Sequence, residues 1–236
     1  MSRYALLLVL LLGLGVAGAT RRPAVSAPAI LAAVVSPRQL RLYYQDEHGR
    51  RLGSLGRLRD YLAGRGQTLT LAMNGGMYAP GGRPQGLLVE NGLTRVPLDT
   101  THGAGNFYLL PNGVFYLTRA GRAGICATGQ YRAAGPVAYA TQSGPLLVHG
   151  GQLNPLFRAG SANVVVRNGV GVLPDGRVLL ALSRGPINFY DFASYFQRRG
   201  CREALYLDGF VSRLYWPAGG WQQTDGDFGT IIGVAR

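Results

Sequence analysis

Short glycine turns divide the chain into many short apolar runs, and this feature constrains the fold more than any other. Of the 236 residues, 36 are glycine, which adopts the backbone conformations that tight turns require. Asn91-Gly92, Asn112-Gly113 and Asp175-Gly176 each lie between two apolar runs, the strongest local signal for a β-hairpin. The predicted hairpins cover residues 87–96, 107–117 and 166–182.

The sequence predicts only a few helices. Residues 54–64 and 189–199 carry apolar side chains at helical spacing, and Asn188 is the expected N-cap of the second helix. Further strands are predicted over residues 40–44, 68–73, 144–148, 204–207 and 230–234. The hydrophobic content of 47% is enough for a core. We therefore predict an α+β fold: a single domain over residues 38–236, with mixed, mostly antiparallel β-sheets and a few helices.

The N-terminus has the features of a signal peptide over residues 1–19. Arg3 precedes an apolar run, and Ala17-Gly18-Ala19 matches a cleavage site. An uncleaved anchor is the alternative, but the run is short for a membrane span. Residues 20–37, rich in Ala, Pro and Ser, are predicted to be a linker. We expect an exported protein, periplasmic or extracellular, with no stable membrane insertion after cleavage.

Export bears on the two cysteines, Cys126 and Cys201. An even pair in an oxidising compartment predicts a disulfide. The alternative is two buried free thiols. Neither cysteine has the neighbouring motif of a catalytic nucleophile.

The charge balance favours anionic partners. All 24 basic residues are arginine, and the net charge is +13, so acidic polymers and phosphorylated glycans are attracted. The arginines are scattered and no aromatic-basic motif accompanies them, so we expect no nucleic-acid partner. The oligomeric state is left open.

Four segments place polar residues next to glycine after an apolar strand. Strand ends are common positions for binding sites, and glycine allows a ligand to approach the backbone. The segments are Met73-Asn74-Gly75-Gly76-Met77-Tyr78, Thr141-Gln142-Ser143-Gly144-Pro145, Val166-Arg167-Asn168-Gly169-Val170-Gly171 and Tyr206-Leu207-Asp208-Gly209-Phe210-Val211-Ser212.

These segments, in this order, resemble the phosphodiester glycosidase family, and most closely a bacterial branch of exported proteins. The resemblance covers roughly residues 38–236. It also includes Pro84-Gln85-Gly86-Leu87, Gly105-Asn106-Phe107 and Pro111-Asn112-Gly113-Val114-Phe115. It implies an enzyme that removes a sugar from its phosphodiester link. The family usually has a second glycine after Leu-Asp-Gly, where this chain has Phe210, so the likeness is weakest at the sugar pocket.

Asp208 is the first candidate for a catalytic carboxylate. It ends the apolar strand 204–207, where a buried carboxylate needs either a partner or a role. An Asp-Gly turn is the alternative. Glu90 is the candidate second carboxylate, against a reading as the solvated flank of a hairpin.

Arg167 is the candidate phosphate ligand, because its guanidinium can hold two phosphate oxygens. A salt bridge on a strand, to Asp208 itself, is the alternative. The remaining candidates for substrate binding are Asn74, Gly75, Gln142, Ser143, Asn168 and Ser212. Each polar one has the alternative role of satisfying backbone groups in a turn or cap. Ser143 lacks the partners of a catalytic triad.

No metal or cofactor is predicted. His48, His102 and His149 lack the spacing of metal ligands. Asp225-Gly226-Asp227 offers oxygen ligands but is more typical of a loop before the last strand.

The predicted reaction is hydrolysis of the bond between an anomeric carbon and a phosphodiester oxygen. The leaving phosphate monoester needs charge stabilisation more than a proton, so one carboxylate and one arginine form a minimal set. Two alternatives remain: a non-catalytic envelope protein that binds anionic glycans, and a phosphodiesterase that attacks phosphorus. Convergence of Asp208, Arg167 and a second carboxylate in one pocket would favour the glycosidase.

Overall fold

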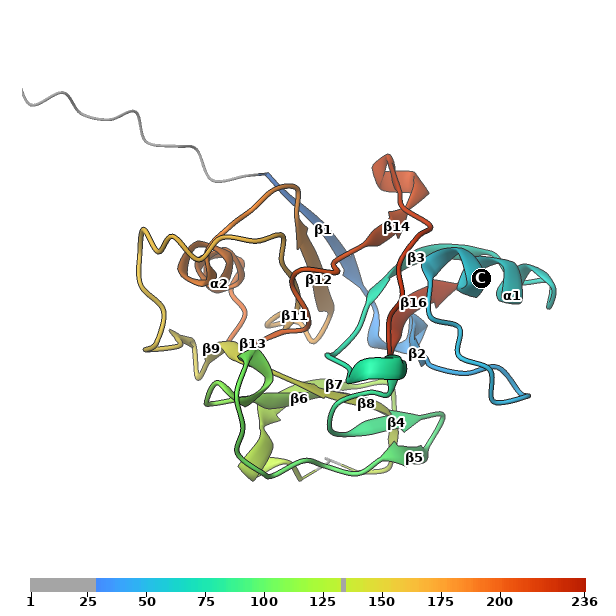
Figure 1. Cartoon of the computed structure of the whole chain (residues 1–236), viewed down its shortest axis with the longest axis horizontal. Coiled ribbons are helices and arrows are strands. Elements are labelled where there is room, and N and C mark those ends of the chain that lie inside the picture. Colours follow the sequence, from blue (N-terminus) through green and yellow to red (C-terminus); the bar gives the residue numbers. More distant parts are fainter. Residues whose placement is uncertain (1–28, 133–134) are drawn as a thin grey trace, which may run out of the picture.

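The computed structural model describes residues 29–132 and 135–236, which form sixteen strands and two α-helices (Figure 1). The strands build three sheets in which all pairings are antiparallel. The predicted class, α+β with sheets dominating in a single domain, is confirmed.

The first sheet has six strands, with helix α2 (Phe189–Arg198) on its outer face (Figure 1). Its strand order is β1 (Ile30–Val35), β12 (Val178–Ser183), β11 (Asn168–Val172), β13 (Glu203–Tyr206), β9 (Leu146–His149) and β10 (Gln152–Leu153). Asn188 caps α2 by accepting a hydrogen bond from the Asp191 N–H at 2.8 Å, as the sequence predicts.

The second sheet has five strands and carries helix α1 (Leu55–Ala63). Its strand order is β15 (Trp221–Gln222), β14 (Leu214–Trp216), β3 (Leu69–Asn74), β16 (Ile231–Ala235) and β2 (Leu40–Tyr43). The last strand of the chain, β16, lies between two early strands, so both ends of the domain are needed to complete this sheet.

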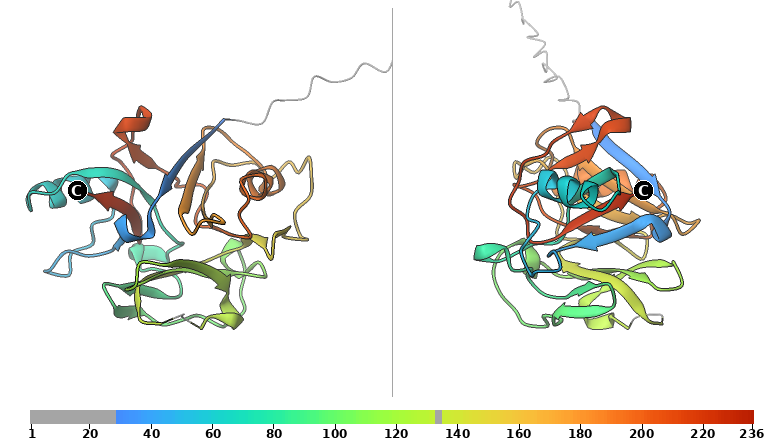
Figure 2. Two further views of the ribbon diagram at one scale, coloured as in Figure 1. Left: turned by 180° about the vertical axis from the view of Figure 1, so that it is seen from behind. Right: turned by 90° about the vertical axis from the view of Figure 1, so that its right-hand side faces the viewer.

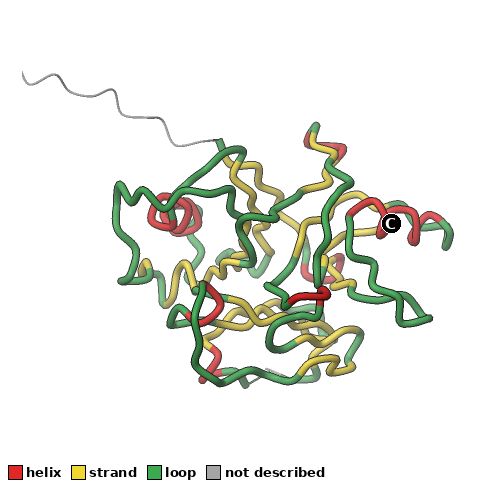
Figure 3. The backbone as a smooth tube through the Cα atoms, in the orientation of Figure 1, coloured by secondary structure: helices red, strands yellow, loops and turns green. Residues whose placement is uncertain are grey.

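The third sheet lies across the other two, as the views in Figure 2 show. Its strand order is β5 (Leu93–Val96), β4 (Leu88–Glu90), β8 (Val137–Ser143), β6 (Gly113–Thr118) and β7 (Ala123–Ala127). Short 3-10 turns and loops complete the described chain (Figure 3): Pro37–Gln39, Pro80–Gly82, Asn106–Tyr108, Thr128–Gln130 and Pro217–Gly219.

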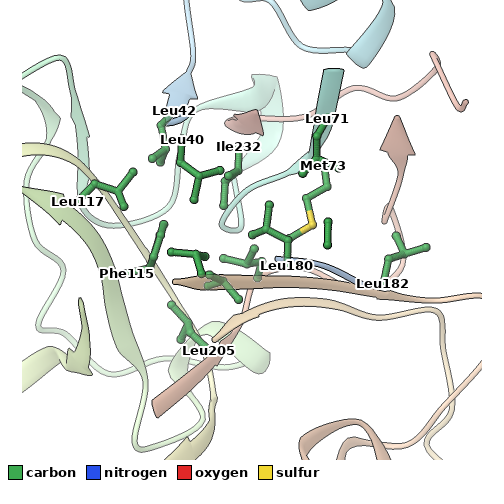
Figure 4. Packing of buried hydrophobic residues seen from close by; sticks show 14 of the residues in the cluster. Leu40, Leu42, Leu71, Met73, Phe115, Leu117, Leu180, Leu182, Leu205 and Ile232 are labelled. Carbon is green, nitrogen blue, oxygen red and sulfur yellow. The ribbon is translucent and has the colours of Figure 1, made fainter. Parts of the chain in front are cut away.

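The main core lies where the three sheets meet (Figure 4). Leu180 and Leu205 come from the first sheet, Met73 and Ile232 from the second, and Phe115 from the third; each is at most 1% exposed. Because every sheet contributes apolar side chains to one cluster, burial fixes the three sheets relative to one another. The same packing fixes the positions of the strand ends that surround this cluster.

Two of the three predicted hairpins are confirmed, β4–β5 and β11–β12. The predicted hairpin over residues 107–117 is wrong. Residues 106–108 form a 3-10 turn, and β6 pairs with β7 and β8 instead. The reason is local: the Asn112 side-chain amide donates to the Phe107 carbonyl at 2.9 Å, which folds the preceding segment back on itself.

The predicted linker is too long at its C-terminal end. Residues Ile30–Val35 form β1, which pairs with β12 from Ile30↔Ser183 to Val35↔Val178. Leu31 and Ala33 point into the core, so this segment has the alternating burial of a half-buried strand. The sequence does not reveal it, because nearly all residues of the run are apolar and no polar residue marks the exposed positions. The predicted signal peptide and the rest of the linker before residue 29 lie outside the described residues. Within the described residues, the helices are too short or too polar to span a bilayer.

The predicted disulfide is not formed: Cys126 and Cys201 are free thiols. Cys126 alternates on β7 with Ile125, which faces the main core, so its thiol faces the outer side of the third sheet. Cys201 is buried between the first sheet and α2, against Phe196. The two side chains therefore point to different layers. Burial raises the pKa of both thiols, that of Cys201 to about 11.

Candidate active site

The four polar segments predicted from the sequence converge where the three sheets meet. Asn74 ends β3, Ser143 ends β8, Asn168 begins β11, and Asp208 follows β13. The Asn168 amide donates to the Asn74 carbonyl at 2.8 Å, and the Asp208 N–H donates to the Asn168 Oδ1 at 2.9 Å. The Ser143 hydroxyl donates to the carbonyl of Leu207 at 2.6 Å. Side chains of the segments therefore hold one another in place.

Asp208 is a largely buried carboxylate without an ion-pair partner among the described residues. Burial raises its pKa to about 6, and the Gly209 N–H, which donates to Oδ1 at 2.6 Å, opposes the rise in part. Its backbone is fixed as well, because the Ser212 hydroxyl donates to the Asp208 carbonyl at 2.8 Å. A rigid carboxylate with a pKa near neutrality can exchange a proton with a bound molecule.

Arg167 does not act as an open phosphate clamp in this structure, and it does not pair with Asp208. Its side chain is only 1% exposed. Nε donates to the Ile187 carbonyl at 2.8 Å, and Nη2 donates to the Asn163 carbonyl at 3.0 Å. The guanidinium carbon lies 3.6 Å from the centroid of the Phe189 ring. These contacts stabilise a buried cation without a carboxylate.

Tyr206 connects Arg167 to the Leu-Asp-Gly turn. Arg167 Nη1 donates to the Tyr206 hydroxyl at 3.4 Å, and burial raises the pKa of this phenol. A Cβ at Gly209 would lie 1.9 Å from the same hydroxyl, so only glycine fits after Asp208. Arg167 therefore stabilises the Leu-Asp-Gly turn indirectly, through its hydrogen bond to the Tyr206 hydroxyl.

Asn74 keeps an uncommitted donor beside the site. Its Oδ1 accepts from the Arg213 N–H at 3.0 Å, whereas its Nδ2 is buried and has no hydrogen-bond partner; the Thr230 hydroxyl is in the same state. The Gly75 N–H donates to the Thr230 carbonyl at 2.7 Å. Buried donors are normally paired, so the Asn74 amide and the Thr230 hydroxyl are the two polar groups here with hydrogen-bonding capacity left.

Gln142 has no such capacity, although it was a candidate for substrate binding. Its Oε1 accepts from the N–H groups of Leu87 and Asp99 at 3.0 and 2.9 Å. Its Nε2 donates to the Asp99 carbonyl at 2.7 Å and to the Thr128 hydroxyl at 3.2 Å. Both lone pairs and both N–H groups of the amide are therefore in use. Gln142 fixes loop 97–101 through the backbone of Asp99.

Loop 97–101 is one wall of a groove of about 580 Å³. The groove is lined by residues 78–80, 83–86, 96–99 and 101. Ser143, the residue after Gln142, holds the strand end before Asp208. Neighbouring residues of one strand thus fix the groove wall and the carboxylate.

Two further residues of the site were not singled out by the sequence. Tyr78 lines the groove, and its pKa is raised by burial and by the negative charges of Asp208 and Asp227, so this phenol is near both the groove and the carboxylate. Arg213 follows Ser212; its Nε is 2.8 Å from Asp225 Oδ2. Tyr78 ends the Asn-Gly-Gly segment, but no local pattern marks Arg213.

The structure does not bring Glu90 to Asp208. Glu90 accepts from the Tyr44 N–H at 2.8 Å and from Arg95 Nε at 3.2 Å. The pairing of Leu88 with Thr141 places it near Tyr139, about 14 Å along β8 from Ser143 at 3.4 Å per residue. Glu90 is buried, with 9% exposure, and its bond to Tyr44 holds the hairpin against the residue after β2, so it is not a solvated hairpin flank either.

In the described chain, no three His, Cys, Asp or Glu side chains gather as metal ligands. The acidic residues of Asp225-Gly226-Asp227 instead pair with arginines: Asp225 with Arg213 at 2.8 Å and Asp227 with Arg51 at 2.6 Å.

Comparisons with known proteins show the family and the fold of the chain. The family model described as phosphodiester glycosidase matches residues 67–234. The chain is 36% identical over 212 residues to the uncharacterized protein YigE of Escherichia coli (strain K12), covering 88% of this chain and 82% of that protein.

Two solved structures share the fold. The catalytic domain of zebrafish N-acetylglucosamine-1-phosphodiester alpha-N-acetylglucosaminidase, auto-inhibited by its pro-peptide, has a TM-score of 0.61 at 13% identity, over 87% of this chain and 82% of that one. A proposed exported protein of Burkholderia pseudomallei has a TM-score of 0.56 at 12% identity, over 87% and 73%. From the family model and the 36% identical relative, the chain belongs to the phosphodiester glycosidase family.

Proposed function

We propose that this protein hydrolyses the glycosidic bond of a sugar-1-phosphodiester. The observation that carries the proposal is Asp208, a fixed and largely buried carboxylate with a pKa raised to about 6. Asn168 links the backbone of Asp208 to that of Asn74, a buried side chain with an unpaired donor. The family and the shared fold support the reaction class.

In the proposed reaction Asp208, in its ionised form, accepts a proton from water. The water oxygen forms a bond to the anomeric carbon, and the bond from that carbon to the phosphate oxygen breaks. The phosphate monoester leaves with the electron pair and needs positive charge more than a proton. Arg213, which is partly exposed and follows Ser212, is better placed for that role than the enclosed Arg167.

Asn74 Nδ2 is proposed to donate to a substrate oxygen, and Gly75 allows close approach of the sugar. Ser143, Asn168 and Ser212 are proposed as positioning residues, because their side chains bond to the backbone around Asp208. The groove beside Tyr78 is proposed to hold the sugar or the group beyond the phosphate.

We also propose that the chain is exported. The apolar run and Ala17-Gly18-Ala19 support this, as does the likeness to the Burkholderia protein. Cleavage after Ala19 is the expected event, and mass spectrometry of the secreted or periplasmic protein checks it.

The test is an assay of the purified protein on N-acetylglucosamine-1-phosphodiester and related sugar phosphodiesters, following release of free sugar. The Asp208→Asn variant should lower kcat by about 10²–10⁴-fold, the usual cost of losing a general base. Asp175→Asn, which changes an exposed turn carboxylate paired with Arg177, is the matched control and should keep full activity.

The pH dependence gives a second readout. A general base is active when ionised, so kcat should rise with pH through about 6, the pKa of Asp208. Full activity of Asp208→Asn would refute the assignment. Tight binding of these substrates without turnover would instead support the non-catalytic glycan-binding alternative.

A further inference from the structure

A second, basic groove lies at the end of β8 remote from Ser143. Its volume is about 290 Å³, and it is formed by the start of β2, the β4–β5 and β6–β7 turns and Tyr139. Three arginines line it, Arg38, Arg41 and Arg119. All three are exposed at the surface.

No carboxylate neutralises these arginines. The chain has 11 acidic residues, and all of them lie in the part that the structure describes. None is within ion-pair distance of the three guanidinium groups. Glu90, the carboxylate whose charge reaches Tyr139, is bound to Arg95 and the Tyr44 N–H.

The donors of the three arginines are also largely free. Arg41 Nη1 donates to the carbonyls of Arg38 and Leu40 at 2.7 and 2.9 Å. The guanidinium groups of Arg38 and Arg119 donate to no group among the described residues, so most of the N–H groups in this groove remain available to an anion.

The frame of the groove is fixed by backbone hydrogen bonds. The Gly92 N–H donates to the Ala138 carbonyl at 2.7 Å, and the Arg119 N–H donates to the Pro136 carbonyl at 2.9 Å. Gly121 has a φ of +77°, and a Cβ there would lie 2.6 Å from the Arg38 side chain. The glycine turn therefore lets the stem of Arg38 lie against the backbone, inside the groove.

We propose that this groove binds a tetrahedral oxyanion, the phosphate or sulfate group of a soluble anionic glycan. Like charges in a confined groove repel, and an anion with several acceptor oxygens relieves that repulsion while pairing with the planar donor groups of arginine. The groove is about 17 Å along β8 from Ser143 at 3.4 Å per residue, so it is separate from the Asp208 site. The proposed anion binding does not depend on whether the protein is a hydrolase.

The test is calorimetric titration of the purified protein with inorganic phosphate and with inorganic sulfate, against chloride at equal ionic strength. Saturable binding of one anion per chain is expected. Arg119→Gln and Arg38→Gln should each weaken it by about tenfold or more, the usual effect of losing a hydrogen bond to a charged group. Arg198→Gln, at the exposed end of α2 and without a carboxylate partner, is the control and should bind as the wild type does.

If Arg198→Gln weakens anion binding as much as Arg119→Gln and Arg38→Gln do, the effect is one of net charge alone and the proposal is overturned. Anion binding that does not saturate would also overturn it. Binding to phosphatidylglycerol vesicles that phosphate and sulfate do not compete for would assign the groove to a membrane surface and also overturn it. Asp208→Asn should retain the anion site, which separates this outcome from the fate of the proposed activity.

Discussion

The raised pKa of Asp208 implies that the site carboxylate destabilises the fold at neutral pH. In the folded protein this pKa is raised from 3.8 to about 6, which corresponds to about 3 kcal/mol at 1.36 kcal/mol per pKa unit. Between these two pH values the folded state holds a proton that the unfolded chain has lost, so this contribution to stability falls as the pH rises. Above pH 6 the cost of the buried charge is complete.

Asp208→Asn removes that charge with little change in shape, and its Oδ1 can still accept from the Gly209 N–H. We expect the variant to be more stable than the wild type by up to about 3 kcal/mol at pH 8 and by less than about 1 kcal/mol at pH 4. Urea unfolding of both proteins at these pH values measures the two differences. The variant should lose activity while it gains stability.

The exposed carboxylate Asp175 is the contrasting case. Its bonds to Arg177 lower its pKa, so Asp175→Asn should lower stability at pH 8 instead of raising it. Equal unfolding free energies of Asp208→Asn and the wild type at pH 8, or a difference that does not change with pH, would refute the account of a desolvated carboxylate.

Three further predictions follow from the packing around the site. Gly76→Ala should lower the yield of folded protein, because a Cβ there would lie 2.5 Å from the Gln142 carbonyl; circular dichroism and thermal unfolding measure this, and a wild-type Tm would contradict it. Ser143→Ala should cost about 1–3 kcal/mol, because it leaves the buried Leu207 carbonyl without its donor; denaturant unfolding measures it, and a change below 0.5 kcal/mol, roughly the scatter for neutral surface substitutions, would be the wrong result. Thiol titration of the protein unfolded without reductant should find both cysteines reactive, whereas a silent pair would mean that the disulfide forms after all.

The sequence was informative wherever one local pattern decided the outcome. Asn91-Gly92 and Asp175-Gly176 specify their turns through backbone preference alone, and both hairpins are present. The N-cap Asn188 likewise marks its helix. The four polar segments, singled out by their residues, come together because each follows or begins a strand whose end is fixed by the common core.

The sequence was least informative where long-range partners decide a residue's role. Asn112-Gly113 has the same turn signal as the true hairpins, but Asn112 bonds to Phe107 instead. Arg167 looks like a ligand residue from its neighbours in the chain, and only the folded structure shows that Phe189 and Ile187 enclose it. Arg213 shows no local signal, since its position depends on Asn74, 139 residues earlier.

Loop 97–101 is attached to the domain partly through its backbone, in addition to the Asp99 carboxylate, which accepts from the Tyr108 hydroxyl at 2.9 Å, and Leu98, which packs against the third sheet. Gln142 binds the N–H and the carbonyl of Asp99, and these groups are the same whatever residue occupies that position. The backbone bonds to Gln142 therefore keep the loop attached when its groove-facing side chains change, although a change at Asp99 or Leu98 also removes a contact. Relatives with the same glutamine are expected to differ in groove chemistry while keeping the position of the carboxylate, so ligand preference can diversify around an unchanged Asp208.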